Sequence, residues 1–114
     1  EGGMVMGMGY ALMEDTIIEG GKTLTPNFST YIIPTSIDAP DMDTVACEVL
    51  EPSGPYGAKG VGEAVMVPIA PAIAIGIDRA VGARVTHAPA TSERVFHAMR
   101  SRDGGRGAEE GSTA

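Results

Sequence analysis

The chain has 114 residues, no Trp, and a formal charge of −7 that arises from 8 basic and 15 acidic residues. Nucleic-acid affinity depends on phosphate neutralisation, so this acidic balance, with no basic stripe, excludes a nucleic-acid partner. A single cysteine excludes an internal disulfide and any multi-cysteine metal or iron–sulfur site within the chain. No continuous apolar run of 18 residues is evident, so no membrane partner is expected.

Residues 1–14 predict a helix, because Met4, Met8 and Leu12 recur on one helical face. The same stretch holds four glycines, and each costs about 1 kcal/mol relative to Ala inside a helix. Glycines at such positions indicate a close approach of backbone or ligand. Two interpretations stay open. The helix packs tightly against a neighbour, or its N-terminus presents N–H groups to an anionic ligand.

Residues 16–25 predict a hairpin around Gly20-Gly21, and the turn-rich residues 26–42 follow. Residues 43–50 alternate between apolar and polar, which favours a half-buried strand. Val45, Cys47 and Val49 share its apolar face. Cys47 is therefore expected to be a small buried hydrophobe.

Residues 52–63 must form a loop, because four glycines and two prolines exclude a regular helix or a central strand. Apolar residues then recur every four positions from Ile69 to Val81, with Gly82 after them, which predicts a helix. A short strand is expected at residues 84–86.

Thr91 is the expected N-cap of a last helix that runs through Arg100. Its apolar side chains, expected to face inward, are Val95, Phe96 and Met99. Residues 101–114 are rich in Gly, Ser and charge and are expected to form a disordered tail. The element order predicts an α+β fold with helices packed on a small mixed sheet, and too few strands for a complete domain.

Glu63 is the candidate catalytic residue, because it ends the glycine-rich loop directly before an apolar helix. A carboxylate beside the N–H groups of residues 60–62 can be desolvated and tuned as a general base. A glutamate near a helix start also complements the helix dipole, which is its commoner role. Lys59 lacks the spacing and the following Ser or Thr of a P-loop. His87 and His97 have no cysteine or carboxylate at zinc-ligand spacing.

Residues 52–63, PSGPYGAKGVGE, resemble the loop that ends in the active-site glutamate of the xanthine dehydrogenase/aldehyde oxidase family. Residues 1–12, EGGMVMGMGYAL, resemble the segment of these molybdenum hydroxylases near the molybdopterin, usually preceded by a glutamine that this chain lacks. Residues 27–34, 67–74 and 89–100 match the family in order and spacing. The resemblance covers residues 1–100 and implies the C-terminal segment of a molybdopterin-binding domain in the large subunit.

This resemblance implies a molybdenum–molybdopterin cofactor, of which the cytosine dinucleotide form is one variant. It also implies that the dithiolene of this cofactor, rather than protein side chains, holds the metal. It implies that Glu63 is the general base when water hydroxylates an sp² carbon of an N-heterocycle, such as a purine, or of an aldehyde. The residues that it places at the cofactor are Gly2, Gly3, Lys59, Gly60, Val61 and Gly62. Iron–sulfur clusters and FAD are expected on other domains or subunits.

The expected partners are the remainder of the molybdopterin-binding subunit, iron–sulfur and flavin subunits or domains, and a small-molecule substrate. The expected compartment is the cytoplasm, with the periplasm left open. One alternative to an enzyme segment stays open, namely a non-catalytic assembly or interaction remnant of such a subunit. Retention of Glu63 within the sequence GVGE favours the interpretation as an enzyme segment, because a structural remnant has no need of that acid.

Overall fold

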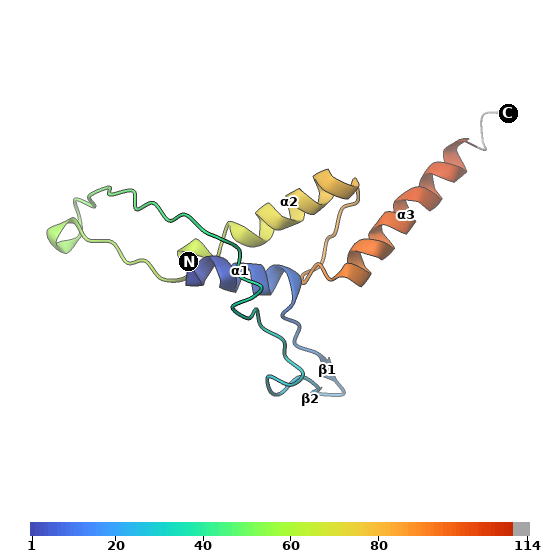
Figure 1. Ribbon diagram of the computed structural model, residues 1–114, viewed down its shortest axis with the longest axis horizontal. Helices are drawn as coiled ribbons and strands as arrows, with labels where there is room; N and C mark the ends of the chain where they lie inside the picture. The colour runs from blue at the N-terminus through green and yellow to red at the C-terminus, as the bar shows by residue number, and fades with distance from the viewer. Residues whose placement is uncertain (111–114) are drawn as a thin grey trace.

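The structure is a computed structural model, which describes the backbone of residues 1–110 and the side chains of residues 1–102. Three α-helices, two short strands and two 3₁₀ turns follow one another along the chain (Figure 1). They are α1 (Gly2–Leu12), β1 (Ile18–Glu19), β2 (Lys22–Thr23), η1 (Pro55–Gly57), η2 (Glu63–Val65), α2 (Ile69–Val81) and α3 (Ser92–Glu110).

Helices α1 and α2 lie side by side and form the centre of the fold (Figure 1). Both were predicted, and α2 has the expected bounds, with Gly82 as its C-cap at φ 64°. A Cβ atom built on Gly7 would lie 2.6 Å from the Cβ of Ile69. The glycines of α1 therefore allow the two helices to approach closely, which confirms the packing interpretation of this helix.

The predicted hairpin is present as the antiparallel pair β1–β2, in which Ile18 is opposite Thr23 and Glu19 is opposite Lys22. Gly20 and Gly21 have φ values of 55° and 77°, which is the geometry that a tight two-residue turn requires. The fold is thus α+β, but the sheet is antiparallel and two-stranded rather than mixed.

The start of α3 is fastened to the end of α1. The Thr91 hydroxyl accepts a hydrogen bond from Arg94 N at 3.3 Å, so Thr91 is the N-cap that the sequence predicts. The guanidinium of Arg94 donates to Asp15 Oδ2 at 2.9 Å and to the Pro89 carbonyl at 2.8 Å. Ala90 N also donates to the carbonyl of Ala11 at 2.6 Å. Residues far apart in sequence therefore hold these two helices together.

Two predicted strands are wrong, because residues 43–50 and 84–86 form no strand in the structure. Val45 and Val49 are 83% and 65% exposed, and the predicted burial of Cys47 is also wrong, since this side chain is exposed. An alternating pattern needs a neighbouring strand to pair with, and the described part of the chain places none beside residues 43–50.

Helix α3 extends to Glu110, beyond the predicted end at Arg100. Ser101 Oγ donates to the His97 carbonyl, and a guanidinium nitrogen of Arg102 donates to the Val81 carbonyl at the end of α2. The structure thus differs from the expected disordered tail over residues 101–110, and residues 111–114 lie outside the described residues. The division of the chain at residue 100 stays a prediction.

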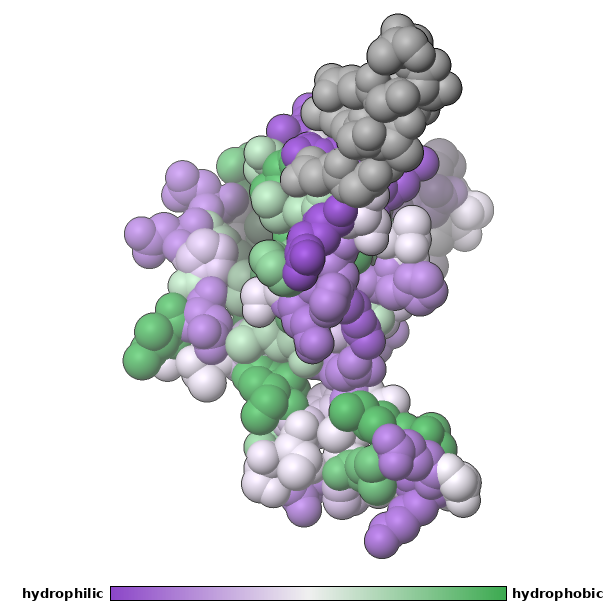
Figure 2. Space-filling view, turned by 90° about the vertical axis from the view of Figure 1, so that its right-hand side faces the viewer, coloured by the Kyte–Doolittle hydropathy of each residue, from purple (hydrophilic) through white to green (hydrophobic). Residues whose placement is uncertain are grey.

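Apolar side chains remain largely on the surface. The only buried hydrophobic residues among those described are Ala11, Ala83 and Ala90. Phe96, expected to face inward, is 54% exposed, and Figure 2 shows hydrophobic side chains in several separate surface patches. The radius of gyration is 19.6 Å, whereas a compact domain of this length would have about 13 Å. The residues whose side chains the structure describes therefore form no core of their own, as expected for an incomplete domain.

Residues Glu63–Val81 are long and apolar enough to cross a membrane by length and composition alone, although Asp78 and Arg79 interrupt the apolar run. The stretch is not one helix, because η2 and α2 are separated by a turn that contains Pro68. Helix α2 alone has 13 residues and a length of about 20 Å, against about 30 Å for a hydrocarbon core. We therefore interpret α2 as a packing helix.

Candidate active site

Glu63 is the first residue of η2, the turn that connects the glycine-rich loop to α2. Its carbonyl accepts a hydrogen bond from Met66 N at 2.9 Å, and the Met66 carbonyl accepts one from Ile69 N at 3.1 Å. These successive turns join the backbone of Glu63 to the start of α2. The side chain is exposed and makes no hydrogen bond or ion pair with any described residue. Its carboxylate is therefore available to a ligand.

The N-terminus of α1 lies against the same turn. A Cβ built on Gly3 would lie 3.1 Å from Val65 Cβ and 3.9 Å from Met66 N. A side chain at position 3 would therefore require Val65 or the start of α1 to shift by a few tenths of an ångström. The structure thus brings Gly2 and Gly3, two predicted cofactor-binding residues, next to the turn that begins with Glu63, although the sequence separates them by about sixty residues.

The other predicted cofactor-binding residues, Lys59 to Gly62, form an exposed extended segment that leads into η2. Val61 is 79% exposed. A Cβ built on Gly2, Gly60 or Gly62 would meet no other atom within 4 Å. The backbone at these positions is open on the side where a side chain would stand, so a ligand can approach it directly.

The preceding part of the loop forms a closed turn that the sequence analysis did not resolve. Glu51 N donates to the Gly57 carbonyl at 3.1 Å, and the Glu51 carboxylate accepts hydrogen bonds from Ser53 Oγ and Ser53 N. The Ser53 hydroxyl bond, followed by the backbone bond, lowers the pKa of the Glu51 carboxyl. Tyr56 stands fully exposed on this turn with φ 57°. The Pro52-Ser53-Gly54-Pro55 sequence is the signal that could have identified the turn.

No group of three or more His, Cys, Asp or Glu side chains gathers at metal-binding distance within the described residues. His87 bonds to the Thr86 hydroxyl through Nδ1, and His97 lies 3.8 Å from Glu93 one turn away in α3. Neither imidazole belongs to the Glu63 turn.

The chain is similar in sequence to several proteins of known family. Residues 1–40 match a family model described as a molybdopterin cofactor-binding domain. The chain is 37% identical over 97 residues to the xanthine dehydrogenase molybdenum-binding subunit of Escherichia coli O157:H7, covering 83% of the chain and 13% of that protein. It is 34% identical over 98 residues to the aldehyde oxidoreductase molybdenum-binding subunit PaoC of Escherichia coli K12, with the same coverage.

A solved structure is also similar. Quinoline 2-oxidoreductase from Pseudomonas putida 86 superposes with a TM-score of 0.78 at 29% identity, over 87% of this chain and 13% of that one. The fold and the matched residues thus identify the chain as part of a molybdopterin-binding domain. The chain belongs to the xanthine dehydrogenase/aldehyde oxidase family, as a segment related to its molybdenum-binding subunit. It spans about one eighth of the length of the relatives that it matches.

Proposed function

We propose that this chain supplies the catalytic carboxylate of a molybdenum hydroxylase. In this proposal Glu63 is the general base when an sp² carbon of an N-heterocycle or an aldehyde is hydroxylated with oxygen from water. The reaction removes two electrons and two protons from substrate and water together. The similarity to subunits of a xanthine dehydrogenase and of an aldehyde oxidoreductase supports both substrate classes.

The observation that carries the proposal is the contact between Gly3 and Val65. Residues 1–40 match the molybdopterin-binding model, and the start of their helix lies against the turn that begins with Glu63. A cofactor held by the first residues of α1 would therefore be a neighbour of this turn. An exposed carboxylate that bonds to none of the described residues is available to accept a proton there.

The residues fit such a cofactor. The first N–H groups of a helix have no partner within the helix and favour anions such as phosphate. The open backbone at Gly2, Gly60 and Gly62 leaves room for a ligand, and Lys59 adds a positive charge. We infer that Gly2, Gly3 and Lys59–Gly62 would hold the cofactor, whose metal supplies activation of water and accepts the electrons.

We infer that the other parts of the enzyme lie on other polypeptide regions. A relative at 35% identity is the gamma subunit of the 6-hydroxypseudooxynicotine dehydrogenase complex of Paenarthrobacter nicotinovorans. By analogy, the remainder of the molybdenum-binding subunit would complete the pocket. Iron–sulfur and flavin subunits would remove the electrons in the cytoplasm. The cofactor would be molybdopterin or its cytosine dinucleotide form.

Turnover per bound molybdenum of the subunit carrying Glu63→Gln tests the proposal. Loss of turnover with full cofactor content supports it. Turnover close to that of the parent would remove Glu63 from the chemistry and favour the non-catalytic alternative.

A further inference from the structure

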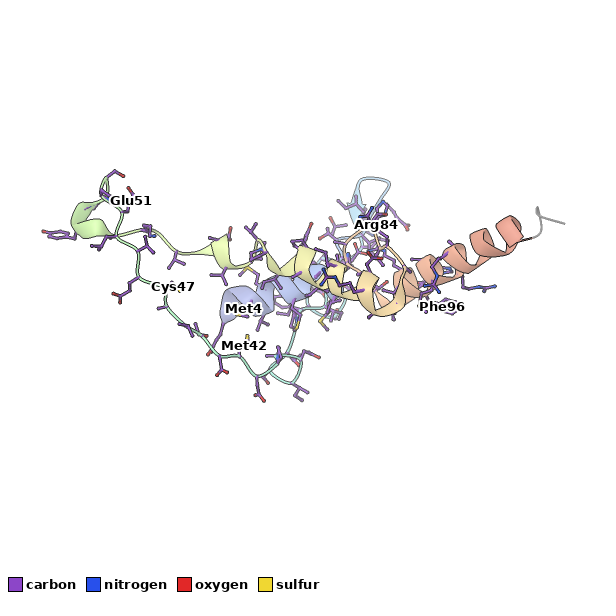
Figure 3. All side chains as sticks on the ribbon, turned by 90° about the horizontal axis from the view of Figure 1, so that it is seen from above. Met4, Met42, Cys47, Glu51, Arg84 and Phe96 are labelled. Carbon is purple, nitrogen blue, oxygen red and sulfur yellow. The ribbon has the colours of Figure 1, made fainter. Side chains whose placement is uncertain are left out.

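An open pocket lies where the segment that connects α2 to α3 meets the start of α3, and its volume is about 240 Å³. Residues 84–87 line it from the connecting segment, and Arg94, His97 and Ala98 line it from α3. Figure 3 labels Arg84 on the connecting segment. This lining, called here the basic pocket, shares no residue with the Glu63 turn or with α1.

The basic pocket gathers positive charge in a chain whose formal charge is −7. Two arginines and both histidines of the chain line it, and none of the described carboxylates does. Part of this charge is balanced from outside the pocket, because Asp15 is paired with Arg94 and Glu93 lies 3.8 Å from His97. The charge that remains available belongs to Arg84.

The Arg84 side chain is exposed and makes no hydrogen bond or ion pair with any described residue. Asp78 lines an adjoining pocket together with Arg84, but the two are not paired. A guanidinium presents its N–H donors in a planar fork that matches the oxygens of an anion. Arg84 is therefore the residue of the basic pocket that is most open to an anionic ligand.

The connecting segment offers further hydrogen-bond donors. The backbone N–H groups of residues 84–87 bond to no described residue, although backbone donors normally have a partner. His87 Nδ1 lies 3.0 Å from the Thr86 hydroxyl. When Nδ1 accepts from this hydroxyl, His87 Nε2 carries the proton and can donate to a ligand.

We propose that the basic pocket binds a phosphate group, either as inorganic phosphate or as a phosphate monoester. The oxygens of a phosphate point in several directions, so one group can accept hydrogen bonds from the connecting segment and from α3 together. A carboxylate has two oxygens in one plane and cannot satisfy both sides as well. A bound phosphate would link residues 84–87 to the start of α3. The inference does not depend on the role of Glu63.

Isothermal titration calorimetry of the complete, cofactor-loaded molybdenum-binding subunit with inorganic phosphate tests the proposal. The loaded cofactor keeps phosphate out of the cofactor site. At constant ionic strength we expect saturable phosphate binding and much weaker binding of acetate. Glycerol phosphate in place of inorganic phosphate distinguishes the two sources by which of them binds more tightly. No phosphate binding, or acetate binding as tight as that of phosphate, would overturn the proposal.

A pair of arginine variants locates the binding. Arg79, in the last turn of α2, is exposed and does not line the basic pocket. We expect Arg84→Ala to weaken phosphate binding by about tenfold or more. Arg79→Ala should weaken it by less than about twofold, because salt screens a charge outside the pocket. Equal effects of the two variants would show a response to overall charge alone and would overturn the site.

His87→Gln is a second variant within the pocket, and it should also weaken phosphate binding. Unchanged binding in both His87→Gln and Arg84→Ala would place the phosphate elsewhere and overturn the proposal. None of these measurements uses turnover, so a failure here and a failure of the Glu63→Gln experiment are distinguishable.

Discussion

Gly7 of α1 and Ile69 of α2 are in contact without space for a side chain on the glycine. A Cβ built on Gly7 would lie 2.6 Å from Ile69 Cβ and 3.1 Å from each of the two γ-carbons. Real carbon atoms do not approach so closely, so the backbone of α1 itself forms the surface on which α2 packs. This contact explains why α1 tolerates a glycine that costs about 1 kcal/mol in helix propensity.

We therefore predict that Gly7→Ala destabilises the subunit by about 1–3 kcal/mol, because the new methyl group overpacks the contact with Ile69. Gly76→Ala in α2 is the matched control, since a Cβ there meets nothing within 4 Å. The control should be neutral or stabilising by up to about 1 kcal/mol through helix propensity. Urea unfolding of the two variant subunits measures both effects. A stabilising effect of Gly7→Ala would contradict the packing seen here.

Arg94 of α3 bonds to Asp15, which follows α1, and to the carbonyl of Pro89, which precedes α3. The Arg94–Asp15 ion pair is partly exposed, at 39% and 38%, so screening limits its own contribution. We predict that Arg94→Ala costs about 1–2 kcal/mol, because a hydrogen bond to a carbonyl is lost together with the ion pair. Asp15→Asn should cost less than about 1 kcal/mol.

The salt dependence of unfolding separates the two contributions of Arg94. At high salt the effect of Asp15→Asn should nearly vanish, whereas most of the Arg94→Ala effect should persist. Equal losses for the two variants at every salt concentration would show that the Pro89 carbonyl bond contributes nothing.

Tyr31 donates its hydroxyl to Glu14 Oε2 at 2.6 Å. This hydrogen bond, with burial and the Glu14 charge as smaller causes, raises the pKa of Tyr31 above its usual value of 10.0. A raised pKa means that the contribution of this contact is complete below about pH 10 and is lost as pH rises through the higher value in the folded state. We predict that Glu14→Gln lowers the pKa of Tyr31, measured by ultraviolet absorbance with Tyr31→Phe as reference. An unchanged titration would contradict the contact.

Glu63→Gln keeps the shape of the side chain but cannot accept a proton. We predict a loss of about 10²–10⁴-fold in turnover per molybdenum, the range of a general base. Glu51→Gln is the control, because Glu51 belongs to the preceding turn and bonds to Ser53. It should leave turnover within a few-fold of the parent. A helix-dipole role for Glu63 would change only stability, by about 0.3–1 kcal/mol.

The elements that the sequence predicts correctly are those that local chemistry defines. Gly20-Gly21 requires a tight turn, Thr91 caps a helix, and the four-residue apolar period ends at Gly82, so each signal lies within a few residues. The failures, at residues 43–50 and 84–86, concern strands. A strand exists only with a partner, and the alternation of Val45 and Val49 does not reveal whether the described chain contains one.

Some features of the candidate site could likewise be predicted from the sequence, and others could not. The loop of residues 52–63 and the position of Glu63 before a helix could be predicted, because glycine and proline exclude regular structure there. The contact of Gly3 with Val65 could not, because it depends on how α1 packs against η2. The closed turn between Glu51 and Gly57 was also missed, since it depends on a side chain accepting bonds from its neighbours.

The Asp15–Arg94 and Ala11–Ala90 contacts join positions that are 79 residues apart in the chain. Closing a flexible loop of that length costs roughly 4 kcal/mol of chain entropy before any contact is formed. The C-terminal end of the first helix therefore cannot form these two contacts until nearly the whole segment has been synthesised. Folding should be slow for its length, and the C-terminal end of the first helix should stay open to chaperones until residue 94 has left the ribosome, whereas the face toward α2 can pack once residue 81 is available.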